Sequence, residues 1–366
     1  MRKSITSAAV LFGLTASVIV GASAPANAVA ATNIVGNGSS FQDDFQQHCI
    51  TKFNADTTAT GGKTLNIVAS YTKSSSGDGR TALGAGNADF AGSDSEGTAT
   101  GLTASNSVYI PIAAAPVAFF FNLKNGATVI SGLNLDSATL SKIFRGDITK
   151  WNDAAIKALN ASVSLPNSTI SVQYRSGDSG TSKNLFKFFN ATSGNSSAWT
   201  TTNGIWTTGN KGTVVGTSNS GGAALVTNVA ATPNSIGYAD LSDVTTSVKL
   251  VALKNGAGAY VKPTAAAATA YIKGTGVLTA NVTYAGVYTL DWTKNIAGAY
   301  QFTILTYMIA KTSGTGYDAP HNASVKAYAK YMIAKCSNNP AGISAPGFVT
   351  PGTTVLAVAT TQINKL

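Results

Sequence analysis

The sequence predicts an α/β protein that is built as two lobes around mostly parallel sheets. Apolar stretches of strand length alternate with stretches of helical periodicity along most of the chain, which is the pattern of sheets covered by helices. The 366 residues suffice for two domains with separate cores, and 44% of them are hydrophobic. Four loops that follow predicted strands are rich in Ser, Thr and Gly. Because such loops converge at the carboxyl ends of the strands, we expect a ligand cleft between the lobes.

The first third of the chain is expected to alternate strands and helices. Residues 33–35 predict a strand that ends in a turn at residues 36–38, and Ser39 or Ser40 can cap a helix whose apolar residues recur at near-helical spacing. Further on we expect a strand over residues 65–69, a small-residue loop over 74–79, a short helix over 80–83, a strand over 89–91, and strands over 108–112 and 117–123 that Pro111 and Pro116 separate.

The rest of the chain continues this alternation. We expect helices over residues 138–144, 153–159, 179–189, 221–229, 325–335 and 354–366, and strands over residues 170–174, 236–239 and 302–309. A crossing between lobes is expected near residues 113–116. The first lobe then comprises residues 33–113 and 297–366, and the second comprises residues 114–296.

The N-terminus has the features of an export signal, residues 1–28. Arg2 and Lys3 precede an apolar run over residues 8–20, and a small-x-small cleavage pattern ends at Ala28. No Cys follows at the cleavage region, so we expect no lipid anchor, and no later stretch has the length of a membrane span. The mature protein is therefore expected in the periplasm or the medium.

Composition narrows the range of partners. The formal net charge is +10 although only 11% of residues are charged, a balance that attracts anions. Basic residues do not form a run with interleaved aromatic residues, so nucleic acid is not expected as a partner. His48 and His321 lie far apart without metal-ligand spacing. We expect neither a metal nor another cofactor.

The two cysteines are Cys49 and Cys336. In an exported protein such a pair favours a disulfide, and two free thiols are the alternative. Closing so long a loop would stabilise the fold by roughly 4 kcal/mol or more in the chain-entropy model. A bond would place both ends of the chain in one lobe.

One segment supplies what a desolvated tetrahedral oxyanion requires. Arg175 ends a predicted strand, and its guanidinium can bind two oxygens of an anion. Ser179, Gly180 and Thr181 open the following helix, where hydroxyls and unpaired backbone N–H groups lie together. Each residue type alone is more often structural, so the signal lies in the combination.

Three further loops complete the expected site. Ser40 with the Phe41 backbone, and Ser76, lie at two other predicted helix starts, and Asp94 follows a predicted strand. A carboxylate beside an anion is useful if the anion donates a hydrogen bond. Asp94 would then accept a hydrogen bond from protonated phosphate and repel sulfate, which has no proton to donate at neutral pH.

These motifs resemble the phosphate-binding protein of the phosphate ABC transporter, the PstS family, with its type 2 periplasmic-binding-protein fold. The resemblance extends from about Ile34 to the closing helices and is densest over residues 143–153. Residues 36–41 look like the family's G-x-G-x-[ST]-F, residues 76–79 like S-x-x-G, residues 89–94 like D-F-x-x-S-D, residues 175–181 like R-x-x-x-S-G-T, and residues 236–238 like I-G-Y.

The resemblance implies an ABC transporter permease as partner and a protein that binds inorganic phosphate without converting it. We expect a monomer that closes on the ligand. Trp151 and Tyr238 match family motifs but look like packing residues. The implied phosphate contacts are Ser40, the Phe41 backbone, Ser76, Asp94, Arg175, Ser179, Gly180 and Thr181.

Two departures and two alternatives accompany the resemblance. The family usually has an Asp two residues after the phosphate-binding Arg, but here Gly177 takes that position and the acid is Asp178. The group that orients Arg175 is therefore open. The family's Pro after the first Phe is Gln42 here.

The first alternative is a secreted adhesion or signalling protein of the same fold that retains phosphate binding. The second is a serine hydrolase that uses Ser179, because the segment 177–180 looks like a trypsin-type nucleophile sequence. The α/β pattern and the Thr at position 181 disfavour the hydrolase.

Overall fold

The computed structural model describes residues 31–314, 316–343 and 345–366. The predicted signal peptide, residues 1–28, lies outside the described residues. The principal sheet has the order β2-β1-β3-β15-β4-β10-β8-β9, and β11, β7 and β12 extend it beside β4. Its strands are β1 (Thr32–Ser39), β2 (Ile67–Ser74), β3 (Phe90–Ser93), β4 (Ser107–Asn122), β7 (Leu133–Leu135), β8 (Ser171–Arg175), β9 (Thr217–Asn219), β10 (Ser235–Asp240), β11 (Lys249–Lys254), β12 (Tyr260–Val261) and β15 (Thr303–Lys311).

Strand direction divides this sheet into parallel outer parts and an antiparallel centre. β1 is parallel to β2 and β3, and β8 is parallel to β9 and β10. β4 is antiparallel to β15, β10 and β11. The expectation of mostly parallel sheets therefore holds for the outer strands and is wrong for the centre, because β4 and β15 run against their neighbours. Two small antiparallel pairs are β5 (Lys124–Asn125) with β6 (Thr128–Val129) and β13 (Leu278–Ala280) with β14 (Tyr288–Leu290).

β4 is one strand of 16 residues and not the expected two strands. Its register against β15 shifts between Thr306 and Tyr307, which leaves Ile112 as the extra residue between Ala113 and Pro111. A bulge of this kind lets the strand continue past a proline that lacks an N–H donor. Residues 107–116 of β4 pair with β15, and residues 117–122 pair with β10. The chain thus passes from one part of the sheet to the other within β4, although the lobe boundaries themselves stay a prediction.

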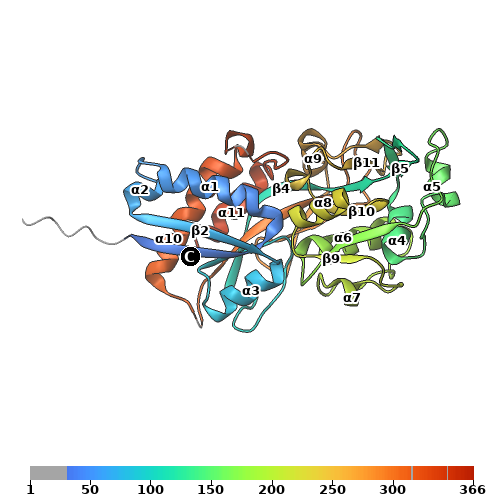
Figure 1. Cartoon of the computed structure of the whole chain (residues 1–366). Coiled ribbons are helices and arrows are strands. Elements are labelled where there is room, and N and C mark those ends of the chain that lie inside the picture. Colours follow the sequence, from blue (N-terminus) through green and yellow to red (C-terminus); the bar gives the residue numbers. More distant parts are fainter. Residues whose placement is uncertain (1–30, 315, 344) are drawn as a thin grey trace, which may run out of the picture. The chain divides into compact units, whose positions relative to one another are not determined.

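Helices cover both parts of the sheet, as Figure 1 shows for the described residues. α1 packs on β2, α3 and α10 pack on β1, α11 packs on β4, and α8 packs on β10. The helices are α1 (Asp43–Ala55), α2 (Gly62–Leu65), α3 (Ser76–Ala85), α4 (Ser137–Arg145), α5 (Ala154–Leu159), α6 (Gly180–Thr192), α7 (Trp206–Gly209), α8 (Gly222–Ala231), α9 (Ala265–Ile272), α10 (Ala319–Tyr331) and α11 (Thr353–Ile363). Short turns are η1 (Ser40–Gln42), η2 (Leu241–Asp243), the π-helical η3 (Met332–Ser337) and η4 (Pro340–Ile343).

Two local expectations near the N-terminus are wrong. Residues 36–38, expected as a turn, are part of β1 and pair with β3. Gly36 allows this close approach, since a Cβ at this position would lie 2.2 Å from the Phe90 ring. The loop expected over residues 74–79 contains the start of α3. The Ser75 hydroxyl accepts from the Asp78 N–H at 3.1 Å and the Asp78 carboxylate accepts from the Ser75 N–H at 3.3 Å. This capping box starts a helix despite two glycines in its first turn.

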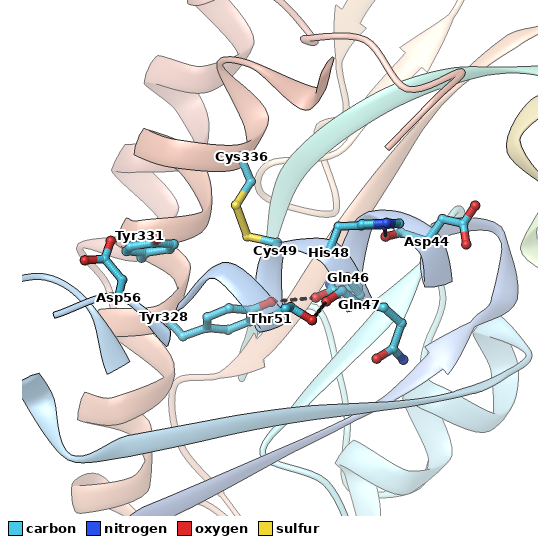
Figure 2. Close-up of a disulfide and its surroundings, with 10 residues drawn as sticks. All are labelled: Asp44, Gln46, Gln47, His48, Cys49, Thr51, Asp56, Tyr328, Tyr331 and Cys336. Atoms are coloured by element: carbon cyan, nitrogen blue, oxygen red, sulfur yellow. Dashed lines mark hydrogen bonds between the residues drawn. A yellow bond between two sulfur atoms is a disulfide. The ribbon is translucent and has the colours of Figure 1, made fainter. Parts of the chain in front are cut away.

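The predicted disulfide is present and joins Cys49 on α1 to Cys336 in η3 (Figure 2). Both cysteines are fully buried. Beside them, the Tyr328 hydroxyl donates to Gln46 Oε1 at 2.9 Å, as Figure 2 shows. Segments 287 residues apart in sequence therefore belong to one core. In the part of the chain that the structure describes, no helix has the length and apolarity of a membrane span.

Candidate functional site

The carboxyl ends of β1 and β3 meet at a buried carboxylate, Asp94. Asp94 Oδ2 accepts from the Ser39 hydroxyl at 2.5 Å and from the Thr181 hydroxyl at 3.4 Å. Asp94 Oδ1 accepts from the Thr306 hydroxyl at 2.7 Å. The Asp94 N–H donates to Ser76 Oγ at 3.1 Å. Four chain segments thus converge on a side chain that is only 3% exposed.

The N-terminus of α6 lies against this carboxylate. Ser179 is the N-cap, and its hydroxyl accepts from the Ser182 N–H at 3.3 Å. A Cβ added to Gly180 would lie 2.3 Å from Ser76 Oγ and 3.1 Å from Asp94 Cβ, so only a glycine lets the helix approach this closely. The first N–H groups of a helix have no partner within it. The amides of Gly180 and Thr181 therefore remain for an anion.

Arg175 ends β8 with its charge unpaired. The residue is 2% exposed, and within the described residues its guanidinium makes no hydrogen bond or ion pair. Its backbone N–H donates to the Tyr238 hydroxyl at 3.2 Å, and that hydroxyl contacts Ser182 Oγ at 2.6 Å. The strand end is therefore fixed by Tyr238, while the charged group stays available to a ligand. Tyr238 and Trp151 are fully buried, as expected of packing residues.

Ser40 and Phe41 form η1 at the end of β1. The Ser40 hydroxyl is buried and has no hydrogen-bond partner within the described residues. The Phe41 N–H donates to Ser39 Oγ at 3.1 Å. Ser40 lines a cavity of about 380 Å³. Its lining also includes Lys73, Ser74, Ser75, Asp78, Ser176, Gly177, Ser220, Gly221, Gly222, Ala223, Ala224 and Asp243.

The charge of Arg175 influences two buried carboxyl groups, Asp94 and Asp243. Burial raises the pKa of Asp94, and hydrogen bonds from Ser39 and Thr306 together with the Arg175 charge oppose that rise. Burial also raises the pKa of Asp243, and its hydrogen bond with Asp240 and the charges of Lys73 and Arg175 oppose the rise. The positive charge of Arg175 therefore favours the ionised form of both carboxyl groups.

Asp178, the acid of the 175–181 loop, does not pair with Arg175 in the structure. Asp178 pairs with Arg80 of α3, with 2.7 Å between Oδ2 and Nη2, and not with Arg175. Arg80 was not a candidate in the sequence, because an arginine in a short helix is usually exposed. Here it is 3% exposed, and Arg175 is therefore not the sole buried cation near Asp94. The burial of Arg80 depends on its contact with Asp178, which is distant in the sequence, so no local sequence pattern could have predicted its role.

Among the described residues, neither histidine lies beside Ser179, where the hydrolase alternative requires a base. His48 Nδ1 contacts the Asp44 carbonyl at 2.7 Å, and His321 Nδ1 lies 3.3 Å from Asp89 Oδ1. A serine nucleophile needs a base within hydrogen-bond reach. In the described residues, the Ser179 hydroxyl instead caps α6. Nowhere among the described residues do three or more His, Cys, Asp or Glu side chains form a group that could hold a metal ion.

The converging loops and the mixed sheet define the class of protein. They have the architecture of the type 2 periplasmic-binding proteins, as the sequence predicted. Residues 23–335 match the PBP superfamily domain family, and the chain belongs to that family.

Similar sequences carry the same family resemblance. Phosphate-binding protein PstS 3 of Mycobacterium tuberculosis is 36% identical over 168 residues, which are 44% of this chain and 41% of the relative. Phosphate-binding protein PstS of Xylella fastidiosa is 34% identical over 219 residues, 59% of this chain and 57% of the relative. The chain thus spans about two fifths of the mycobacterial relative and somewhat more than half of the other. The resemblance to the PstS family is confirmed.

Solved structures extend the fold comparison over most of the chain. A high-affinity periplasmic phosphate-binding protein, PfluDING, has a TM-score of 0.66 at 22% identity and covers 90% of this chain and 93% of its own. A putative phosphate ABC transporter substrate-binding protein from Clostridium perfringens has a TM-score of 0.58 at 14% identity, with coverage of 87% and 99%. These similarities support the fold.

Proposed function

We propose that this protein binds inorganic phosphate at the convergence of β1, α3, β3 and α6 and presents it to an ABC transporter for uptake, without chemical conversion. The observation that carries the proposal is a buried, unpaired guanidinium on Arg175 near a buried carboxylate on Asp94. A small protonated oxyanion is bound well by this combination of a guanidinium with two parallel donors, a carboxylate that accepts a hydrogen bond, and two helix N-termini. The names of the relatives and structural neighbours agree with this ligand.

The proposed contacts follow from this arrangement. Arg175 binds two oxygens, and the amides of Gly180 and Thr181 donate at the start of α6. The Asp94 carboxylate accepts a hydrogen bond from the protonated oxygen of the ligand. The remaining proposed donors are the hydroxyls of Ser40, Ser76 and Ser179 and the Phe41 N–H. The Phe41 N–H donates to Ser39 Oγ at 3.1 Å in this structure and exchanges that bond for the ligand.

We further propose the division into lobes at residues 33–113 with 297–366 and residues 114–296, closing over the ligand. We also propose export after cleavage of residues 1–28. Determination of the N-terminal sequence of the secreted protein tests the export, and a start other than Val29 would contradict the cleavage site.

Calorimetric titration of the mature protein with phosphate, arsenate and sulfate tests the ligand. We expect one phosphate per chain, competition by arsenate, and no binding of sulfate at matched concentration. Arg175→Ala should weaken phosphate binding by roughly 100-fold or more, since it removes two charge-assisted hydrogen bonds of about 1.5 kcal/mol or more each. Lys142→Ala, which removes one exposed positive charge on α4, is the matched control. Absence of phosphate binding by the unaltered protein would end the proposal.

A further inference from the structure

The loop between Arg175 and Ser179 is attached to α3 through one residue, Asp178. Its carboxylate Oδ2 lies 2.7 Å from Arg80 Nη2, and its Oδ1 accepts from the Gly204 N–H at 2.6 Å. Its carbonyl accepts from the Gly77 N–H at 3.0 Å. Two of these three bonds therefore tie the loop to the first turns of α3.

The Arg80 guanidinium extends this attachment to the segment around Asp94. Nη1 donates to Ser93 Oγ at 2.9 Å and to the Ser95 carbonyl at 3.3 Å. The side chain of Arg80 is 4% exposed and that of Asp178 is 26% exposed. One guanidinium thus contacts the residues on both sides of Asp94 and the residue before Ser179.

Further contacts dock the same segment on α6. Asn184 Nδ2 donates to the Asp94 carbonyl at 2.7 Å, and Lys183 Nζ donates to the Glu96 carbonyl at 2.9 Å. The ion pair therefore lies at one edge of a continuous contact between residues 93–96 and the 175–184 segment. It does not itself line the cavity beside Ser40.

The order Gly177-Asp178 has two consequences. Gly177 has φ of +68°, a left-handed conformation that glycine adopts without steric cost. This turn precedes the acid that points to α3. Because Asp178 is engaged by Arg80, Arg175 has no carboxylate partner within the described residues, and its charge is left for the ligand.

We propose that Arg80 and Asp178 are a positioning pair that holds the anion-binding loop against α3 and the Asp94 segment, so that the pair controls how long the ligand stays bound. This inference rests on the proposed phosphate binding. Neither side chain is a ligand contact, and Arg175 is oriented through its backbone bond to Tyr238 and not through an acid in its own loop. Arg80 lies in the proposed first lobe and Asp178 in the second, so the pair joins the two lobes where they close over the ligand. Loss of a buried charge pair across such a contact acts mainly on the dissociation rate.

A double-mutant cycle tests the pair. Arg80→Gln and Asp178→Asn each remove one charge and keep a polar side chain of similar shape. We expect each to raise the dissociation rate and the Kd of phosphate about 10-fold, with little change in association rate. The double variant should lose no more than either single variant, because the residues act as a unit. Asp178→Glu, which restores the charge, should recover part of the affinity.

The control is Asp147→Asn, which breaks the more exposed Arg145–Asp147 pair, with 2.9 Å between Nε and Oδ2. It should leave the Kd unchanged. Additive losses in the double variant, or an altered ratio of phosphate to sulfate affinity, would overturn the inference by showing that Arg80 acts on the ligand separately. Unchanged dissociation in both single variants would also overturn it.

A ligand-independent readout separates this inference from the proposed function. Without added phosphate, Asp178→Asn should speed amide hydrogen exchange at Gly77 and across residues 176–179 several-fold, while exchange in α4 stays unchanged. If the unaltered protein fails to bind phosphate, the proposed function fails, whatever the exchange result. Unchanged exchange in a protein that does bind phosphate would overturn the positioning role alone.

Discussion

Replacement of Asp94 by Asn tests how the proposed site distinguishes phosphate from sulfate. Asp94 accepts from Ser39, Thr181 and Thr306, and an Asn retains one of its two oxygen acceptors. The fold around it should therefore persist. The change removes a negative charge next to the position where an anion bound by the Thr181 amide would lie.

The size of the effect follows from electrostatics. Two like unit charges about 4 Å apart cost about 4 kcal/mol at an effective dielectric constant of 20. The Arg175 charge offsets part of this repulsion. We therefore expect the ratio of sulfate Kd to phosphate Kd to fall by about 100-fold, chiefly because sulfate binds better.

Competition calorimetry at neutral pH measures both constants in the unaltered protein and the variant. Phosphate itself should bind more weakly, because the charged acceptor of its proton is lost. An unchanged ratio of the two constants would refute the role given to Asp94. Circular dichroism of the variant controls for loss of structure.

Three other predictions follow from the packing, the buried acids and the disulfide. Gly180→Ala should weaken phosphate binding at least 10-fold, since the new methyl group meets Ser76 Oγ at 2.3 Å. Gly132→Ala, where nothing lies within 4 Å, should leave titrations unchanged, and equal affinities would contradict the close approach. Burial raises the pKa of Asp240 well above its usual 3.8. Its contribution to stability is therefore present below pH 3.8 and is lost as pH rises through the folded pKa. As pH rises from 3.8 through the folded pKa of Asp240, the Asp240→Asn variant should become more stable relative to the unaltered protein, because it carries no carboxyl group to ionise. Parallel curves of unfolding midpoint against pH for the two proteins would contradict this prediction. Cys49→Ser should lower the free energy of unfolding by roughly 5 kcal/mol or more in denaturant titrations, because the bond closes a loop of 287 residues, and a loss under about 1 kcal/mol would contradict it.

The residues of the proposed site could be named from the sequence because each lies at a junction that local chemistry marks. Ser76 and Thr181 lie in the first turns of helices, and Asp94 follows a buried strand. Hydroxyls and glycines at helix starts have a local physical reason, so their positions can be predicted. Their convergence follows from the way α/β sheets gather such loops.

The features that sequence reasoning missed depend on contacts between distant segments. The continuity of β4 past Pro111 requires a bulge against β15, which is formed by residues almost 200 positions away. The pairing of Arg80 with Asp178 joins residues 98 positions apart. Neither segment carries a local pattern that names its partner, and propensity alone favoured a broken strand and an exposed arginine.

A crystal structure of the mature protein with phosphate tests the central claim most directly. The phosphate oxygens should lie within hydrogen-bond distance, about 2.6–3.2 Å, of the Arg175 guanidinium, the Asp94 carboxyl group and the Thr181 amide. Phosphate bound elsewhere, for example beside Lys73 without contact to Arg175, would contradict the account.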